Sequence, residues 1–177
     1  AYAPAPVVTD EVMQQVYDRI LKPMVDAMRT EGYPFVGCLY AGLMITSEGP
    51  KVVEFNCRFG DPETEVVLPM LDGDLAQIMM DCVHGTLSSD SIKWKKGYAV
   101  DVVMATRGYP GAHSSDDKIS GLREAEQEGC HVFHAGTALK GDTFYTAGGR
   151  VLNVVAMAPT LEEAREKAYQ GVKKIHW

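Results

Sequence analysis

Hydrophobic residues recur every four positions near the start of the chain. This spacing is shown by Val12, Val16, Ile20, Met24 and Met28, and it places them on one face of a helix. Thr9 is a suitable N-cap and is followed by two acidic residues in the first turn, where they favour helix formation. The pattern therefore predicts an amphipathic helix over residues 9–29, which Pro23 should kink or divide.

The next stretch predicts a β-hairpin, with strands over residues 35–46 and 51–59 and a turn at 47–50. Side chains of a strand alternate between its two faces. In the second strand, Val53, Phe55 and Cys57 would form an apolar face, and Glu54, Asn56 and Arg58 a polar one. The hairpin would bring Tyr40 and Leu43 beside this polar row.

Further elements follow from the same periodicities. We expect a short helix over residues 62–68, interrupted by Pro69. A second helix is expected over residues 73–83, ended by Gly85, with Met79 and Met80 filling the core. Residues 86–96 are polar and predict a linker. Strand patterns follow over residues 98–106, 130–139, 143–147 and 150–158, and a capping box of Thr160 and Glu163 opens a last helix to about residue 174. The order of elements indicates an α+β fold with two subdomains.

The polar row carries chemistry that an ordinary strand does not need. Glu54 and Asn56 offer oxygen ligands for a hard cation, and Arg58 offers a forked donor for phosphate. Gly60 allows a sharp exit, after which Asp61 would cap a helix that begins at Pro62. The alternative is a half-exposed antiparallel strand whose outer face simply meets water.

Composition narrows the function classes. The net charge is −7 and the pI about 5.2, which argues against general nucleic-acid binding. The four cysteines form no C-x-x-C pair and are expected to be buried free thiols of a reducing compartment. No signal peptide or membrane span is evident, so we predict a cytoplasmic protein without a membrane partner. The first residue is not Met and the last is Trp177, which suggests a fragment.

Several sequence blocks together point to a known family. Residues 52–63 read VVEFNCRFGDPE, with Gly42-Leu43-Met44 and Gly49-Pro50-Lys51 upstream. This segment resembles the metal-binding segment of glycinamide ribonucleotide synthetase (phosphoribosylamine–glycine ligase), an ATP-grasp family of purine synthesis. Residues 1–6, with Ala3 in place of the usual Ser, and residues 37–42, 107–111, 134–137 and 148–152 resemble other blocks of the family in the same order.

The resemblance implies a fold and an activity. Residues 1–92 would form the C-terminal half of an ATP-grasp domain, an antiparallel sheet with helices, and residues 93–177 a small β-rich C-terminal domain with a terminal helix. The enzyme would be an ATP-dependent C–N ligase that joins glycine to 5-phosphoribosylamine through a glycyl phosphate in de novo purine biosynthesis. ATP and Mg²⁺, or Mn²⁺ in its place, would be its cofactors.

The resemblance also implies site residues. Glu54 and Asn56 correspond to the metal-binding pair, and Arg58 would stabilise charge on the transferred phosphoryl group unless it forms a salt bridge with Asp61 or Glu63. Asp61 and Glu63 would contact the amine or ribose of 5-phosphoribosylamine, or serve only to cap the helix. Arg150 would reach toward the nucleotide or serve only the turn in which it lies.

The family's N-terminal domain, its glycine-rich lid and its adenine contacts would all lie upstream of this chain. The chain is therefore expected to be inactive alone and to need the missing N-terminal part of the same enzyme as its partner. Two alternatives stay open: a non-catalytic half-domain that docks to a complementary chain, and an ATP-grasp ligase for another carboxylate. A metal shared by His131 and His134 is not expected, because residues three apart on a strand face opposite sides.

Overall fold

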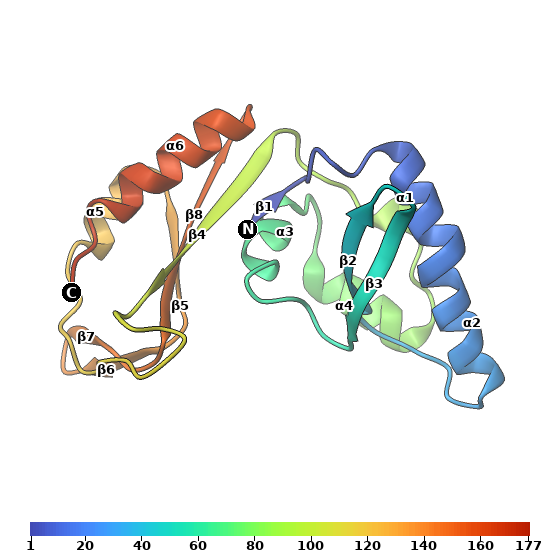
Figure 1. The fold of residues 1–177 in the computed structure, drawn as a ribbon, viewed down its shortest axis with the longest axis horizontal. Coiled ribbons are helices and arrows are strands. Elements are labelled where there is room, and N and C mark those ends of the chain that lie inside the picture. The colour runs from blue at the N-terminus through green and yellow to red at the C-terminus, as the bar shows by residue number, and fades with distance from the viewer. The chain divides into compact units, whose positions relative to one another are not determined.

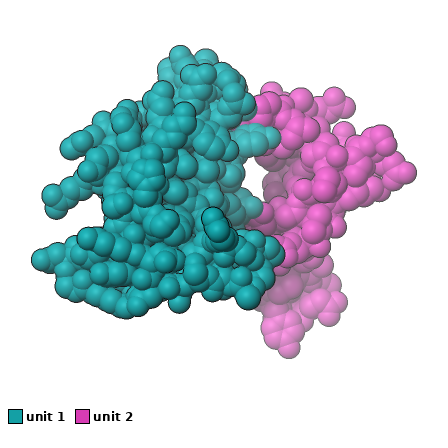
Figure 2. Space-filling view, turned by 60° about the vertical axis from the view of Figure 1, so that its left-hand side comes forward, with its two compact units in different colours: residues 1–3, 61–70, 95–177 teal, residues 4–60, 71–94 magenta.

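The computed structural model describes residues 1–177 and divides into two compact units, coloured separately in Figure 2. Unit 1 comprises residues 1–3, 61–70 and 95–177, and unit 2 comprises residues 4–60 and 71–94. Both units combine antiparallel strands with helices. The predicted α+β class is confirmed.

The predicted N-terminal helix of unit 2 is divided by a wider turn. α1 (Asp10–Val16) leads through a π-helical turn (Tyr17–Leu21) into α2 (Lys22–Thr30), and the segments follow one another in Figure 1. Thr9 caps α1 by accepting a hydrogen bond from the Val12 amide at 3.3 Å. The wide turn ends two residues before Pro23, which has no N–H for the regular helical ladder.

The hairpin of unit 2 forms, with shorter strands than the pattern predicts. β2 (Tyr40–Thr46) and β3 (Gly49–Asn56) are antiparallel, so residues 35–39 and 57–59 lie outside the strands. Tyr40 pairs with Asn56 as expected, but a β-bulge after Gly42 pairs Leu43 with Val52. An extra residue on one strand shifts every later pair. The expectation that Leu43 lies beside the polar row is therefore not met: Leu43 pairs with Val52, and Gly42 lies across from Glu54.

The second helix of unit 2, α4 (Leu75–His84), has caps at both ends. Asp74 accepts a hydrogen bond from the Gln77 amide at 3.1 Å, and Gly85 ends the helix in the left-handed region at φ 70°. Met79 and Met80 are 48% and 49% exposed. The prediction that they fill a core is therefore wrong for this structure, because they lie on the open side of the helix.

Unit 1 is built on a four-stranded antiparallel sheet with the strand order β1-β4-β8-β5. Its strands are β1 (Tyr2–Ala3), β4 (Tyr98–Ala105), β5 (His131–His134) and β8 (Arg150–Ala158). A two-stranded sheet of β6 (Thr137–Lys140) and β7 (Thr143–Thr146) accompanies it. The predicted strand over residues 130–139 is thus divided at Ala135 and Gly136, and β1 was not predicted.

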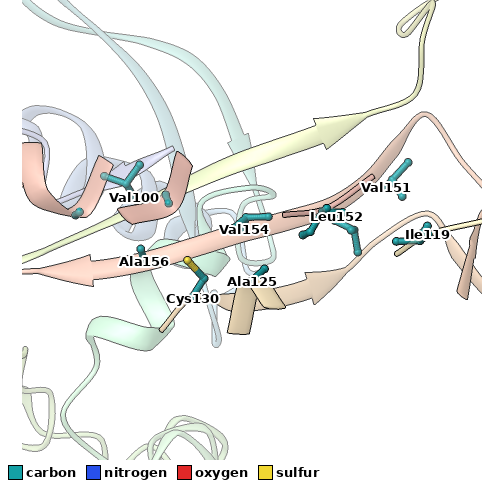
Figure 3. Close-up of a cluster of buried hydrophobic side chains, with 11 residues drawn as sticks. Val100, Ile119, Ala125, Cys130, Val151, Leu152, Val154 and Ala156 are labelled. Atoms are coloured by element: carbon teal, nitrogen blue, oxygen red, sulfur yellow. The ribbon is translucent and has the colours of Figure 1, made fainter. Parts of the chain in front are cut away.

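Three helices complete unit 1: α3 (Thr64–Met70), α5 (Leu122–Gln127) and α6 (Leu161–Val172). α5 was not predicted. On one face of the sheet, Leu152, Val154 and Ala156 of β8 are fully buried with Ala164 and Ala168 of α6, and Figure 3 shows the strand side chains of this core. On the other face, Ala99 of β4 packs with α3.

The expectations for the cysteines are met only in part. The four cysteines are free, but only Cys130 is buried; Cys38 and Cys82 are half-buried and Cys57 is exposed. The prediction that all four are buried is wrong, because the segments that hold the other three lie near the surface of unit 2. No helix combines the length and the apolar character that crossing a membrane requires.

The predicted capping box of α6 is present and gives a stability prediction. The Thr160 hydroxyl accepts from the Glu163 amide at 3.2 Å, while the Glu163 carboxylate accepts from the Thr160 amide at 3.1 Å. Thr160→Ala leaves the Glu163 amide without its acceptor and should lower the free energy of unfolding by about 1 kcal/mol. Urea unfolding measures the change. Gln170→Ala, at an exposed position of the same helix, should change it by less than about 0.5 kcal/mol, and an equal loss in both variants would contradict the prediction.

Candidate functional site

The polar side chains of β3 form a coupled pair. The Asn56 side-chain amide donates a hydrogen bond to Oε1 of Glu54 at 2.9 Å, which is the contact expected of residues two apart on one strand face. Gly42 lies across from Glu54, and a Cβ atom on Gly42 would come within 3.1 Å of the Glu54 Cγ. The glycine therefore leaves the carboxylate the room it occupies.

This pair suits a hard cation. A carboxylate and an amide oxygen are ligands that Mg²⁺ accepts, and Mg²⁺ commonly takes only one or two ligands from protein and the rest from phosphate and water. No group of three or more His, Cys, Asp or Glu side chains is arranged to hold a metal. The two oxygen donors therefore suit a metal ion that is bound together with a phosphate ligand. They do not make up a closed site whose ligands all come from the protein.

One partner of the pair borders an apolar cavity of unit 2. Asn56 lines a space of about 240 Å³. Its apolar walls come mainly from Met24, Met28, Phe35, Leu39 and Phe55. Asn56 is half-buried and Glu54 is exposed, so the carboxylate faces solvent while the amide lies partly against the cavity wall. The arrangement leaves the Glu54 carboxylate accessible to a ligand from outside.

Arg58 is not placed by the strand. It lies two residues beyond the end of β3, and its guanidinium donates to the carbonyl oxygen of Phe59 at 2.9 Å. The expectation that Arg58 continues the row of Glu54 and Asn56 is therefore not met, because the pleat that enforces alternation ends at Asn56.

Asp61 has a partner that lies 89 residues away in sequence. Arg150, the first residue of β8, forms an ion pair with the Asp61 carboxylate at 3.4 Å and also donates to the Asp61 carbonyl oxygen at 3.4 Å. The two side chains are 53% and 40% exposed, so the pair contributes little to stability. The prediction that Asp61 caps a helix beginning at Pro62 is wrong: α3 begins at Thr64 and includes Pro69 in its last turn.

The turn before Arg150 is tightly packed. A Cβ atom on Gly149 would lie 2.4 Å from Cδ2 of Tyr109, so only glycine lets the Tyr109 ring approach. Thr106, which is 3% exposed, donates from its amide to the Gly149 carbonyl at 2.8 Å. These contacts hold the backbone at Arg150 and leave its guanidinium at the surface, an arrangement that suits an anionic ligand.

Glu63 occupies the turn that leads into α3. Its carbonyl oxygen accepts hydrogen bonds from the amides of Val66 and Val67, at 3.2 and 2.9 Å. The structure thus brings Glu54 together with Asn56 and Asp61 together with Arg150, and places Glu63 at the start of α3. Two glycines precede Arg150 in the sequence, but nothing in the sequence pairs it with Asp61.

Sequence reasoning missed a buried acid in the middle of β4. Asp101 is 4% exposed, and burial raises the pKa of its carboxyl group to about 7, with smaller contributions in the same direction from the charges of Glu65 and Asp61 and an opposing one from the chain's amino group. A signal was present, because Asp101 is the only charged residue of the strand sequence YAVDVVMA. The two histidines of β5 behave as predicted. His131 stacks with Phe133 and His134 lies against Phe144, on opposite faces.

Two family models match most of the sequence. Residues 1–64 match the ATP-grasp (A) domain of phosphoribosylglycinamide synthetase, and residues 99–177 match the C domain of the same enzyme. The chain belongs to the phosphoribosylglycinamide synthetase family. The predicted family and the predicted ATP-grasp fold are thereby confirmed. The matched ranges leave residues 65–98 between them, so the division into domains of residues 1–92 and 93–177 stays a prediction.

Individual members of the phosphoribosylglycinamide synthetase family agree with this result. The chain is 46% identical to a phosphoribosylamine–glycine ligase of Rhizobium meliloti, over all of this chain and 42% of that protein. It is also 46% identical to the human trifunctional purine biosynthetic protein adenosine-3, over 99% of this chain and 17% of that protein. The crystal structure of the Thermotoga maritima phosphoribosylamine–glycine ligase superposes with a TM-score of 0.81 at 34% identity, over 99% of this chain and 42% of that one. The chain thus spans less than half of these relatives.

Proposed function

We propose that this chain supplies the metal-holding part and the C domain of an ATP-dependent ligase that joins glycine to 5-phosphoribosylamine in purine biosynthesis. The observation that carries the proposal is the Glu54–Asn56 pair, which lies within the range matched to the ATP-grasp domain of the family. We assign the activity to the cytoplasm, without nucleic acid or membrane as partner. The remaining part of the enzyme would be supplied by the portion of the relatives that this chain does not span.

The proposed reaction has two displacement steps. A carboxylate oxygen of glycine attacks the γ-phosphorus of ATP, which gives glycyl phosphate and releases ADP. The amine nitrogen of 5-phosphoribosylamine then attacks the glycyl carbonyl carbon, phosphate departs with the electron pair of the broken C–O bond, and the nitrogen loses a proton. Such a reaction needs positioning and charge neutralisation rather than a protein nucleophile.

The residues of β3 and its exit would serve the first step. A bound Mg²⁺, or Mn²⁺ in its place, would offset the repulsion between the carboxylate and the triphosphate. Glu54 and Asn56 would hold that cation by their oxygens. Arg58 would stabilise charge on the transferred phosphoryl group. A guanidinium has five N–H donors, so its bond to the Phe59 carbonyl does not exhaust it.

The residues of the turn before α3 would serve the second step. Asp61 and Glu63 would bind the amine or ribose of 5-phosphoribosylamine as hydrogen-bond acceptors. The Asp61–Arg150 ion pair supports this assignment because both side chains are exposed to solvent. The pair offers a hydrogen-bond acceptor and a donor next to each other.

The experiment measures ADP release with ATP, Mg²⁺, glycine and freshly prepared 5-phosphoribosylamine. The first sample is this chain alone, for which we expect no release. The second is a hybrid polypeptide in which the preceding part of the Rhizobium meliloti relative is joined to this chain, for which we expect release that requires both substrates. The preceding part alone is the matched control and should be inactive.

Each outcome has a distinct meaning. Release by this chain alone would keep the ligase assignment and overturn the need for a missing part. A hybrid that folds but releases no ADP, while the intact relative is active in the same assay, would favour the non-catalytic docking module. Release with another amino acid but not with glycine would favour a ligase for a different carboxylate.

A further inference from the structure

A cluster of buried polar groups lies on the face of the unit 1 sheet that α3 covers. Asp101 pairs with Val155 across β4 and β8, and Val103 pairs with Asn153, so Asp101 and Asn153 project to the same side. Both are nearly inaccessible, at 4% and 3% exposure. α3 packs against β4 on this side, and its Glu65 has one carboxylate oxygen buried.

The cluster consists of acceptors that lack donors. Both carboxylate oxygens of Asp101, Oε2 of Glu65 and Oδ1 of Asn153 are buried without a hydrogen-bond partner. A buried acceptor without a partner costs about 1–3 kcal/mol, and more when it is charged. The simplest donor that the cluster can gain is a proton on one of its carboxylates, which converts an acceptor into a donor.

Asp101 is the member placed to take that proton. Three charged groups lie around it: Glu65 of α3, Asp61 with its partner Arg150, and the amino group of Ala1, which donates to the Asp101 carbonyl oxygen at 2.9 Å. A titratable side chain, His131, lies on β5, the strand next to β8. His131 pairs with Val155 and therefore faces the same side from the next strand. Only Asp101 combines burial of both carboxylate oxygens with two neighbouring carboxylates.

We propose that Asp101 is a proton-operated latch between β4 and α3. As the neutral acid, Asp101 donates a hydrogen bond to an acceptor of the cluster and holds α3 on the sheet. When it loses the proton to solvent, the new charge repels Glu65 and loosens the first turns of α3. The latch depends on groups within unit 1 alone and does not rest on the proposed ligase activity.

The direction of the pH effect follows from the raised pKa of Asp101. With α3 closed, the carboxyl group has a pKa of about 7; exposed by opening, it would return toward its ordinary value of 3.8. Between these values the closed state holds a proton that the open state lacks. The equilibrium constant for opening should therefore rise with pH by up to tenfold per pH unit from about pH 4 to about pH 7, and level off above pH 7.

Amide hydrogen exchange of the 177-residue chain at pH 5 and pH 7, corrected for the intrinsic rates, tests the latch. The reporters are the amides of Val66 and Val67, which bond to the Glu63 carbonyl, and the amide of Val154 in the core strand serves as internal reference. Protection of the reporters should fall by at least about tenfold between the two pH values. In the Asp101→Asn variant, whose side-chain amide can donate a hydrogen bond at every pH, the protection of the reporters should change by less than about twofold between the two pH values. Asp142→Asn, at an exposed turn, should behave like the wild type.

Two results would overturn the latch. One is protection of Val66 and Val67 in the wild type that does not change with pH, and the other is a pH dependence that persists in Asp101→Asn. The Asp101 carboxyl carbon, followed by NMR in the wild type, provides a test that needs no variant. Titration of this carbon above pH 6 supports the latch, and titration below pH 5 overturns it.

Discussion

Glu54→Gln should reduce ADP formation by the hybrid ligase on the order of 10²- to 10³-fold, the effect of losing one preorganised group that stabilises developing charge. The substitution keeps the shape of the side chain and an oxygen that can still accept the hydrogen bond from Asn56 at 2.9 Å in the wild type. It removes the negative charge that a divalent cation requires of its ligands. Activity should therefore recover in part at high Mg²⁺, and a titration of ADP formation against Mg²⁺ measures the shift in half-saturation.

The matched control lies in the same hairpin. Glu48 is exposed in the turn between β2 and β3 and pairs with Lys51 at 2.9 Å, so Glu48→Gln makes the same chemical change away from the proposed metal. It should alter ADP formation by less than about twofold, since an exposed pair of this kind is worth little. Glu54→Gln with more than a tenth of the wild-type rate and an unchanged Mg²⁺ dependence would show that Glu54 is not a metal ligand.

Elements with strong local signals were predictable. β8 has the predicted bounds, because its nine residues are apolar apart from Arg150 and Asn153 and are bounded by turns. The caps of α1 and α6 are set by side chains within three residues of their partners. Local periodicity and capping act over a few residues and can be read from the sequence directly.

Features that depend on distant residues were not predictable. The bulge after Gly42 shifts the register between β2 and β3. The order of hydrophobic and polar residues in the two strands does not indicate whether a bulge is present. The partner of Asp61 is 89 residues away, and the burial of Asp101 arises only when α3 and β8 enclose it. Glu54 and Asn56 were accessible to sequence reasoning because strand alternation alone brings them together.

Gly121→Ala should be among the most destabilising single substitutions in unit 1, with a loss of roughly 2–5 kcal/mol in the free energy of unfolding. Gly121 precedes α5 at φ +85°, and an added Cβ atom would lie 1.8 Å from the Lys174 carbonyl oxygen and 2.6 Å from its carbon. The left-handed conformation costs a non-glycine residue about 1–2 kcal/mol, and forcing backbone apart in a packed region adds about 1–3 kcal/mol.

The contact matters because it closes the C-terminal segment onto the core. Ser120 and His176 exchange backbone hydrogen bonds at 3.0 and 3.1 Å. Ile175, which lies between Lys174 and His176 in the sequence, is 3% exposed and belongs to the main hydrophobic cluster of unit 1. A side chain at position 121 would push this segment away from the sheet and expose Ile175. The loss should therefore appear in the unfolding of unit 1 as a whole rather than in local fraying.

Gly141→Ala separates conformational strain from collision. Gly141 has φ +60° and no atom within 4 Å of an added Cβ, so its substitution carries only the cost of about 1–2 kcal/mol for the left-handed region. Urea unfolding followed by Trp177 fluorescence in a Trp94→Phe background reports on unit 1, because Trp177 packs on its core and Trp94 belongs to unit 2. Equal losses in the two variants would show that the approach of Lys174 to Gly121 does not contribute to stability.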